Sequence, residues 1–215
     1  MRIVIAGGHG QIALLTEELL AARGDEVIGL VRRAEQVADL ESRGARGTVL
    51  DLEQADVAAV ADVVRGADAV VFAAGAGPGS GAARKDTVDR AAAVLLADAA
   101  AAAGVSRYLM ISAHGADQAD PDSQEVFQIY LRAKAAADAD LRGRDLDWTI
   151  IRPGGLTDDP GTGRVRLADR VPAGRIPRAD VAALIVAALA DPATIGKQFE
   201  VVSGNDPIAA ALSAL

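Results

Sequence analysis

The amino-acid sequence predicts an α/β fold in which a doubly wound parallel sheet is covered by helices on both faces. Short β-branched runs alternate with longer Ala- and Leu-rich segments, and this alternation leads to parallel strands joined by right-handed crossovers. Several short runs are apolar without a break, as expected for strands that helices cover on both sides. Aromatic residues make up 3% of the chain and hydrophobic residues 51%, so closely packed Ala, Val, Leu and Ile must supply the core.

The predicted strands and helices alternate as far as residue 152. Strands are expected where β-branched and apolar residues cluster, at 3–6, 26–31, 47–50, 69–73, 107–112 and 148–152. Helices are expected in the longer segments between them, at 12–23, 34–43, 55–65, 82–103 and 125–142. The length of 215 residues fits one domain of this kind, so we expect residues 1–215 to form a single unit.

The pattern changes after Pro153. Residues 154–178 are rich in Gly, Pro and charged residues, and a hairpin is expected around residues 165–167. A helix at 180–189 and a last strand at 198–202 follow. Irregular segments of this length in a compact domain usually form lids or binding loops, so we expect 154–178 to cover a substrate or a cofactor.

Composition and charge exclude several classes of function. The chain has 22 Lys and Arg against 30 Asp and Glu, and the net charge of −8 argues against nucleic acid or an anionic membrane as partner. There is no cysteine, and His9 and His114 are the only histidines, so disulfides, thiolate nucleophiles and Cys/His zinc sites are excluded and we expect no metal. The longest apolar run, 181–190, is too short to cross a bilayer, and the first strand reaches Gly7 too early for a signal peptide. We expect a cytoplasmic monomer or homodimer that acts on a small molecule.

A glycine-rich turn follows the first predicted strand and opens the first predicted helix. Its sequence is Gly7-Gly8-His9-Gly10-Gln11-Ile12-Ala13. Gly7 permits the tight turn, Gly10 lets the main chain approach a pyrophosphate, and the small Ala13 lets the helix pack closely on the sheet. The free amides at the start of the helix then face the anion. In the first βαβ unit, this arrangement favours a dinucleotide site over a merely structural turn.

The residues after the second and third predicted strands indicate which dinucleotide binds. An NAD site places Asp or Glu at the end of the second strand to bind the ribose 2′-hydroxyl, whereas this chain has Arg32 and Arg33 there. Guanidinium groups fork onto phosphate oxygens, which favours NADP over NAD; the alternative is that both arginines are solvated at a helix entrance. Asp51 and Leu52 end the third strand and can meet the adenine, although they can also serve only to cap the next helix.

Three polar residues form a candidate catalytic set. Tyr130 and Lys134 are spaced i, i+4 on a predicted helix, so their side chains share one face. An ammonium beside a phenol stabilises the phenolate and lowers the pKa of the phenol, which suits a proton donor. Ser112, at the end of the fifth strand, can hold a substrate carbonyl by a hydrogen bond. The alternative is a structural role, because Tyr130 also belongs to an apolar helical stripe that can pack in the core.

Several motifs occur in a familiar order along nearly the whole chain. They are Gly7-Gly8-His9-Gly10-Gln11-Ile12-Ala13, Asp51-Leu52, Ala73-Ala74-Gly75-Ala76-Gly77, Arg107-Tyr108-Leu109-Met110-Ile111-Ser112-Ala113, Tyr130-x-x-x-Lys134 and Ile151-Arg152-Pro153-Gly154-Gly155-Leu156. Together they resemble the atypical short-chain dehydrogenase/reductases, which have a Rossmann fold. More narrowly, the chain is similar to the small NAD(P)-binding, epimerase/dehydratase-like group related to NmrA-type proteins and to the biliverdin and flavin reductases.

The resemblance implies a role for each motif. It assigns Gly7, Gly10 and Ala13 to the pyrophosphate, Arg32 and Arg33 to the 2′-phosphate, and Asp51 and Leu52 to the adenine. It assigns Ala73, Ala74, Gly75 and Lys134 to the nicotinamide ribose, and Pro153, Gly154, Gly155 and Leu156 to the nicotinamide. Gln11 and Ile12 are also expected to bind the cofactor. Ser112, Tyr130 and Lys134 match the catalytic Ser/Tyr/Lys set of the family. Asp89 stands where many relatives carry a catalytic Asn, and the interval from Ser112 to Tyr130 is longer than in the better-characterised enzymes.

The sequence leaves three hypotheses for the function. The first is an NADP(H)-dependent oxidoreductase in which Tyr130 donates a proton and Ser112 polarises a small carbonyl acceptor, since residues 154–178 and the tail beyond 202 are too short to enclose a nucleotide sugar. The second is a flavin or quinone reductase that needs only proximity to a stacked acceptor. The third is an NADP-binding redox sensor of the NmrA type that binds the dinucleotide without turnover.

Overall fold

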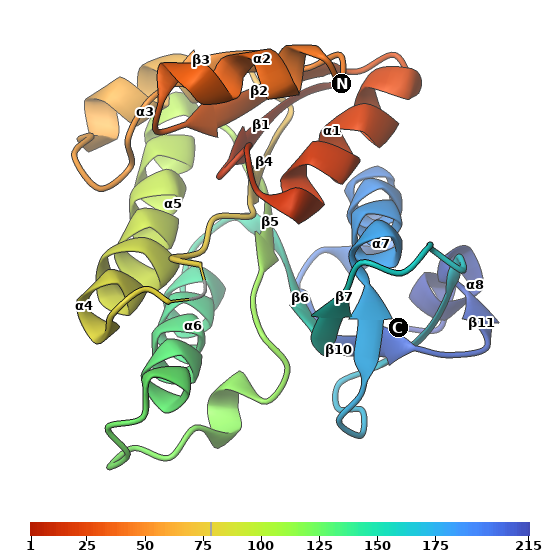
Figure 1. Ribbon diagram of the computed structural model, residues 1–215. Helices are drawn as coiled ribbons and strands as arrows, with labels where there is room; N and C mark the ends of the chain where they lie inside the picture. Colours follow the sequence, from red (N-terminus) through yellow and green to blue (C-terminus); the bar gives the residue numbers. More distant parts are fainter. Residues whose placement is uncertain (78) are drawn as a thin grey trace.

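The computed structural model describes residues 1–77 and 79–215, and a nine-stranded sheet forms its centre (Figure 1). The parallel strands are β1 (Arg2–Ala6), β2 (Glu26–Val31), β3 (Arg46–Val49), β4 (Ala69–Phe72), β5 (Arg107–Ile111), β6 (Asp147–Pro153) and β10 (Lys197–Ser203). At one edge β8 (Arg164–Ala168) and β11 (Asp206–Pro207) run antiparallel to their neighbours. The strand order is β11-β8-β10-β6-β5-β4-β1-β2-β3. The predicted doubly wound α/β sheet is confirmed, and its strands end within about one residue of the predicted bounds because continuous apolar runs specify buried parallel strands.

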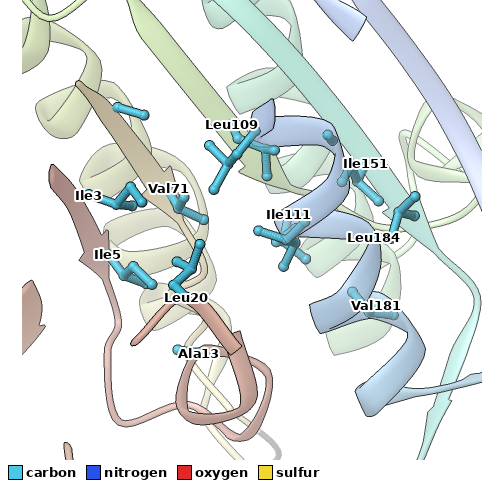
Figure 2. Close-up of a cluster of buried hydrophobic side chains, with 14 of the residues drawn as sticks. Ile3, Ile5, Ala13, Leu20, Val71, Leu109, Ile111, Ile151, Val181 and Leu184 are labelled. Atoms are coloured by element: carbon cyan, nitrogen blue, oxygen red, sulfur yellow. The ribbon is translucent and has the colours of Figure 1, made fainter. Parts of the chain in front are cut away.

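Helices cover both faces of this sheet (Figure 1). On one side lie α1 (Gln11–Ala22), α2 (Val37–Glu41) and α7 (Arg178–Ala190), and on the other α3 (Val57–Val64), α5 (Ala92–Ala103) and α6 (Val126–Arg142). Alternate side chains of β1 serve the two layers: Ile3 and Ile5 pack with Leu20 of α1 (Figure 2), whereas Val4 and Ala6 join the opposite cluster. No helix in the described part of the chain is both long and apolar enough to cross a membrane.

The helix predicted at 82–103 is divided into three parts. A short α4 (Ala82–Arg84) leads into a π-helical segment, η2 (Lys85–Ala91), before the regular α5. The wider π turn buries Lys85 and Asp89, which are 7% and 0% exposed. Such turns inside helices are frequent at functional sites. The remaining short elements are the 3₁₀ turns η1 (Ala34–Gln36), η3 (Ala116–Gln118) and η4 (Pro192–Thr194) and the last helix, α8 (Ile208–Ser213).

Residues 154–178 are more regular than the sequence predicts. They contain β7 (Gly155–Thr157) and β9 (Arg175–Pro177), which form a separate parallel pair, as well as β8. The hairpin expected around residues 165–167 is wrong, because β8 pairs with β10 and β11 from outside the segment. This pairing extends the main sheet and leaves the loop between β8 and β9 near the carboxyl end of β5, where His114 bonds Val171.

Candidate active site

Two clefts meet at the carboxyl ends of β1 and β4. In the sheet, β2 and β3 lie on one side of β1, whereas β4, β5 and β6 lie on the other. The strand order therefore reverses between β1 and β4, and ligands of doubly wound folds bind at such a switch point. The first cleft, of about 240 Å³, extends toward β2 and β3. The second, of about 830 Å³, extends toward β5, α6 and residues 153–156. Both share Gly10 and residues 73–75 as a common wall.

The glycine turn after β1 forms the shared floor of the clefts. Gly7 has φ +82°, and a Cβ atom there would lie 2.5 Å from Ala74 Cα, so only glycine fits. Gly10 caps α1 without a side chain, and the first turn carries no acidic residue, so the amides at this helix end are open to an anion. Gln11 and Ile12 line the second cleft. Ala13 is 1% exposed and outside the lining of both clefts, so it can serve only the packing of α1.

The first cleft carries a group of charged side chains at its outer end. Arg32 lines it with a side chain that is 51% exposed, and its Nη1 atom lies 3.8 Å from Glu53 Oε2. Glu53 also accepts hydrogen bonds from Arg84 at 2.6 Å and from Thr87 at 2.7 Å. The Arg84 bond is the main reason that the pKa of Glu53 lies below its usual range. Arg33 is exposed and lies outside the lining.

Other residues expected at the adenine and ribose also border the clefts. The first is lined by Asp51, Leu52, His9 and Gln36, and His9 Nε2 lies 2.7 Å from Asp39 Oδ2. The wall shared by both clefts is formed by Ala73, Ala74 and Gly75, and the second cleft is lined by Pro153, Gly154, Gly155 and Leu156. The structure therefore brings together every sequence-predicted residue except Arg33 and Ala13.

Lys134 occupies a buried position between β4 and β5. Its Nζ atom donates to the carbonyl of Ile111 at 3.0 Å and to that of Ala74 at 3.5 Å. Asp89 Oδ1 lies 3.6 Å away, is fully buried and has no hydrogen-bond partner in the described residues. Burial lowers the pKa of Lys134, and Asp89 opposes this shift. The ammonium therefore faces the strand ends at which a ribose is expected.

Tyr130 lines the second cleft, and its hydroxyl makes no hydrogen bond to any described residue. Lys134 Nζ lies 6.0 Å from the centre of its ring and Lys85 Nζ lies 5.2 Å away. The expectation that a lysine lowers the pKa of Tyr130 is wrong for this arrangement. Burial raises the pKa of Tyr130, and Asp89 and Asp138 raise it further, so the phenol is protonated at neutral pH.

Ser112 is 3% exposed and belongs to a buried polar network behind the second cleft. Its hydroxyl donates to Asp138 at 2.7 Å, and Asp138 accepts from Arg152 at 2.8 Å. Arg152 also pairs with Asp117. Burial raises the pKa of Asp138, and the Arg152 guanidinium opposes this shift. With its proton donated to Asp138, Ser112 offers the cleft a hydrogen-bond acceptor, not the donor that a substrate carbonyl needs.

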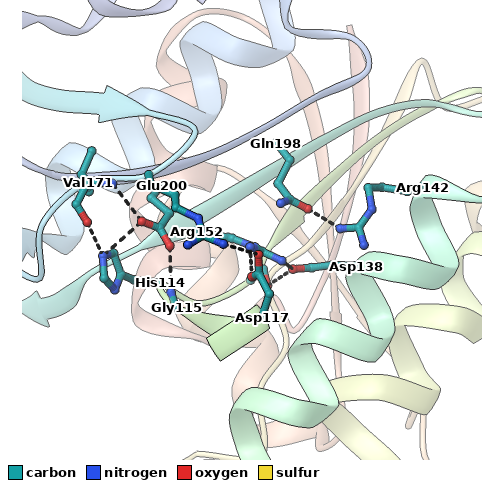
Figure 3. Close-up of polar contacts among 11 residues, drawn as sticks. His114, Gly115, Asp117, Asp138, Arg142, Arg152, Val171, Gln198 and Glu200 are labelled. Carbon is teal, nitrogen blue, oxygen red and sulfur yellow. Dashed lines mark hydrogen bonds and ion pairs between the residues drawn. The ribbon is translucent and has the colours of Figure 1, made fainter. Parts of the chain in front are cut away.

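A second buried carboxylate ties the loop after β5 to the loop before β9 (Figure 3). Glu200 of β10 is 2% exposed and accepts from the amides of Gly115 and Val171, both at 2.9 Å. His114 Nε2 lies 3.2 Å from Glu200 and 2.9 Å from the carbonyl oxygen of Val171. Because His114 lines the second cleft, this clamp fixes one of its walls.

The comparison with known families agrees with the geometry of the first cleft. Residues 7–192 match a family described as NAD(P)H-binding. The chain belongs to this NAD(P)H-binding family. The chain can also hold a nicotinamide dinucleotide on physical grounds. The amides at the start of α1 are open to an anion, and Gly7 and Gly10 have no side chain that would keep a pyrophosphate away from the main chain.

Relatives of this NAD(P)H-binding protein span its whole length. It is 38% identical over 218 residues to a Bacillus subtilis protein described as the uncharacterized sugar epimerase YhfK, with 100% of both chains covered. A solved structure from Bacillus halodurans, provisionally described as an NAD-dependent epimerase/dehydratase, shares 35% identity and a TM-score of 0.91 over 100% of both chains. The oxidoreductase ylbE from Lactococcus lactis shares 28% identity and a TM-score of 0.86 over 100% of this chain and 96% of its own. The resemblance to an NAD(P)-binding, epimerase/dehydratase-like group is confirmed at this level.

Sequence reasoning missed several charged residues in or behind the two clefts. They are Glu53, Arg84, Lys85, Asp138, Arg152 and Glu200. A usable signal existed for one of them: Asp138 lies four residues after Lys134 on the same helix face. No group of three or more His, Asp or Glu in the described residues is arranged to hold a metal ion.

Proposed function

We propose that this protein is an NADP(H)-dependent oxidoreductase that reduces a small carbonyl, quinone or flavin-like acceptor in the second cleft. The observation that carries the proposal is the neutral phenol of Tyr130, whose hydroxyl has no partner among the described residues and whose ring lines the same cleft as the glycine turn. The cofactor, when bound, supplies the hydride. Tyr130 supplies the proton that the acceptor oxygen needs.

The cofactor roles follow from the lining of the clefts. We assign the pyrophosphate to the open amides at the start of α1, the adenine to Asp51 and Leu52, and the nicotinamide to the wall formed by residues 153–156. Arg32 supports NADP over NAD, because its half-exposed guanidinium can reach a 2′-phosphate at the end of β2, where Arg32 and Arg33 stand in place of the Asp or Glu of an NAD site.

The protein side chains then favour one direction of reaction. Reduction of a carbonyl adds hydride to carbon and a proton from Tyr130 to oxygen, after which water returns a proton to the phenolate. The raised pKa of Tyr130 keeps the phenol protonated over the neutral range. Lys134 orients the ribose hydroxyls from its position at the ends of β4 and β5. Ser112 accepts a hydrogen bond from the hydroxyl of the product and does not polarise the carbonyl.

Sugar epimerisation fits these groups less well. An epimerase that works through a nicotinamide must first oxidise a sugar hydroxyl, and this step needs a base to remove its proton. Tyr130 is protonated at neutral pH, because burial and two neighbouring carboxylates raise its pKa, and a protonated phenol cannot act as that base.

The direct test is NADPH oxidation, with NADH for comparison, by the wild-type protein and by Tyr130→Phe against aldehydes, ketones, quinones and flavins. We expect turnover of at least one class and a loss of about 100-fold for carbonyl acceptors in Tyr130→Phe. Tyr108→Phe is the matched control, since Tyr108 is fully buried in the core and its hydroxyl donates to the carbonyl of Ala93. If Tyr130→Phe keeps full activity with every carbonyl, the acid role is wrong; if quinones or flavins still turn over, proximity alone suffices for them.

A second candidate is an NADP-binding redox sensor without turnover. Two observations favour it: the hydroxyl proton of Ser112 is already donated to Asp138, and Val126 and Phe127 at the edge of the second cleft are 46% and 62% exposed, as a surface for a protein partner would be. The same assay separates the two candidates. Tight NADPH binding with no oxidation by any acceptor would replace the oxidoreductase with the sensor.

A further inference from the structure

Lys85 places a buried positive charge in the wall of the second cleft. It begins the π-helical segment η2 and is 7% exposed, yet it belongs to the lining of this cleft. Its Nζ atom donates to the carbonyl of Gly77 at 3.0 Å and lies 5.2 Å above the ring of Tyr130. An ammonium has three protons to donate, so the carbonyl of Gly77 satisfies only part of its capacity.

This ammonium differs from its charged neighbours because it has no counter-ion among the described residues. Arg84, the preceding residue, lies 2.6 Å from Glu53; Lys134 lies 3.6 Å from Asp89; and Arg152 lies 2.8 Å from Asp138. Among residues 1–77 and 79–215, no carboxylate oxygen lies within 4.0 Å of Lys85 Nζ. Burying a charge is costly unless it is paired, so this position is suited to an anion that arrives with a ligand.

The surroundings of Lys85 limit the kind of ligand. Phe127 and Val126 expose large apolar surfaces at the edge of the same cleft, and the rings of Phe127 and Tyr130 lie 6.0 Å apart. A flat molecule can cover these apolar surfaces and the Tyr130 ring together. Arg178, another cation in the lining, already has Asp158 at 2.7 Å, which leaves Lys85 as the better partner for an incoming anion.

We propose that Lys85 is the anion-binding residue of the acceptor cleft, and that the acceptor is a planar molecule carrying a carboxylate or phosphate. This inference rests on the proposed function, because it specifies the class of acceptor. Lys85 does not serve the pyrophosphate in this arrangement: its contacts are Gly77 and Tyr130, whereas the pyrophosphate is assigned to the amides at the start of α1.

Two pairs of probes that differ in one anionic group test the proposal. FMN and riboflavin differ by a phosphate, and 4-carboxybenzaldehyde and methyl 4-formylbenzoate differ by a carboxylate. Binding of each flavin to the NADP⁺-loaded protein is measured by flavin fluorescence, and each aldehyde is compared by kcat/KM for NADPH oxidation. We expect the wild-type protein to prefer the anionic member of at least one pair by about tenfold, as one charge-assisted hydrogen bond supplies.

The variants assign that preference to one side chain. Lys85→Gln should reduce the preference to about onefold, because only the binding or kcat/KM of the anionic probe falls. Lys85→Arg should retain most of the preference. Arg90→Gln is the matched control, because Arg90 lies on the same π-helical segment but its side chain is 41% exposed and paired with Asp86 at 2.6 Å. Thermal unfolding of each variant checks that the fold is kept.

Each outcome separates this inference from the proposed function. Equal affinity for both members of each pair, or an equal loss for both in Lys85→Gln, would overturn the anion site. A fall in NADPH affinity in Lys85→Gln would assign Lys85 to the cofactor and also overturn it. If no acceptor is reduced while FMN still binds more tightly than riboflavin through Lys85, the oxidoreductase function fails and the anion site stands. A preference within one pair only identifies the anion as phosphate or carboxylate.

Discussion

The two clefts that meet at Gly10 are built from different materials. The inner wall of the first is formed by the glycine turn and residues 73–75, and its charged side chains are partly in solvent: those of Arg32, Arg84 and Glu53 are 51%, 36% and 20% exposed. The second is lined by charged side chains held in the interior: Lys85, Asp89 and Lys134 are all at least nine-tenths buried. Buried charges interact strongly and tolerate few rearrangements, whereas main-chain amides bind any suitable anion. We infer that the first cleft provides general affinity for a dinucleotide and the second provides selectivity for the acceptor.

The largest effect, a loss of cofactor affinity, is expected from adding one methyl group to the glycine turn of the first cleft. In Gly7→Ala, the new Cβ would lie 2.5 Å from Ala74 Cα at a φ of +82°, so the turn must move. Cofactor affinity, measured by isothermal titration with NADPH, should fall by more than about 100-fold, since a displaced turn loses several amide contacts together. Gly24→Ala is the control: its φ is +91° with nothing within 4 Å, so it adds backbone strain of about 1–2 kcal/mol but no clash. Equal affinity of the two variants would contradict the assignment.

One buried acid, Glu17, lies in α1 beside the first cleft, and it predicts that the stability of the protein depends on pH. Glu17 of α1 is 0% exposed, its carboxyl oxygens have no partner in the described residues, and burial raises its pKa from 4.5 to about 8. Between these values the folded protein keeps the proton while the unfolded chain loses it, so stability falls as pH rises and levels off above 8. The slope is about 1.4 kcal/mol per pH unit.

Urea unfolding at pH 5.5 and 7.5 measures this contribution. The stability of Glu17→Gln relative to wild type should increase by up to about 3 kcal/mol between the two pH values, because the amide has no proton to lose. Glu18→Gln, on the exposed side of the same helix, should follow the wild-type slope. Parallel pH profiles for wild type and Glu17→Gln would show that Glu17 does not titrate in this range.

For the second cleft, the corresponding test removes one of the two carboxylate oxygens with which Glu200 holds the cleft wall. Glu200→Gln keeps the shape of the side chain but leaves the amide of either Gly115 or Val171 without its acceptor. The loss in unfolding free energy should be about 1–3 kcal/mol, and hydrogen exchange at residues 113–115 and 169–174 should quicken. Asp206→Asn, an exposed change on the neighbouring β11, should alter neither. Unchanged exchange in Glu200→Gln would mean that the clamp does not hold this wall.

The contrast between the clefts also explains what the sequence could predict. The six strands from β1 to β6 and the glycine turn were predictable because uninterrupted apolar runs and the Gly7 and Gly10 spacing are local signals. β8 was not, because its sequence, Arg-Val-Arg-Leu-Ala, becomes a strand only through pairing with β10. The β-propensity of a segment carries little information where pairing with a distant strand decides whether the segment forms a strand.

The charged residues of the second cleft were harder to predict for a related reason. In sequence, Lys85 resembles the solvated charges around it, and its burial depends on a π turn that no local pattern announces. Tyr130 was found by its spacing from Lys134, and Ser112 by its place at the end of a strand. Their protonation could not be predicted, because Asp89 and Arg152 come from distant segments of the chain. Spacing identifies a residue, whereas its pKa and its hydrogen-bond partners depend on the whole fold.

The smallest effect concerns the one side chain on which dinucleotide selectivity is proposed to depend. Arg32→Gln should raise the KM for NADPH about tenfold and leave that for NADH unchanged, because a single charge-assisted contact with the 2′-phosphate is lost and an exposed guanidinium is partly screened by solvent. Arg33→Gln is the matched control, since the neighbouring arginine is equally basic but lies outside the lining of the cleft. Raising the ionic strength should shrink the difference between wild type and Arg32→Gln. If Arg33→Gln has the larger effect, the guanidinium at the 2′-phosphate comes from the outer residue, and if neither variant discriminates, the cleft does not distinguish NADP from NAD at this position.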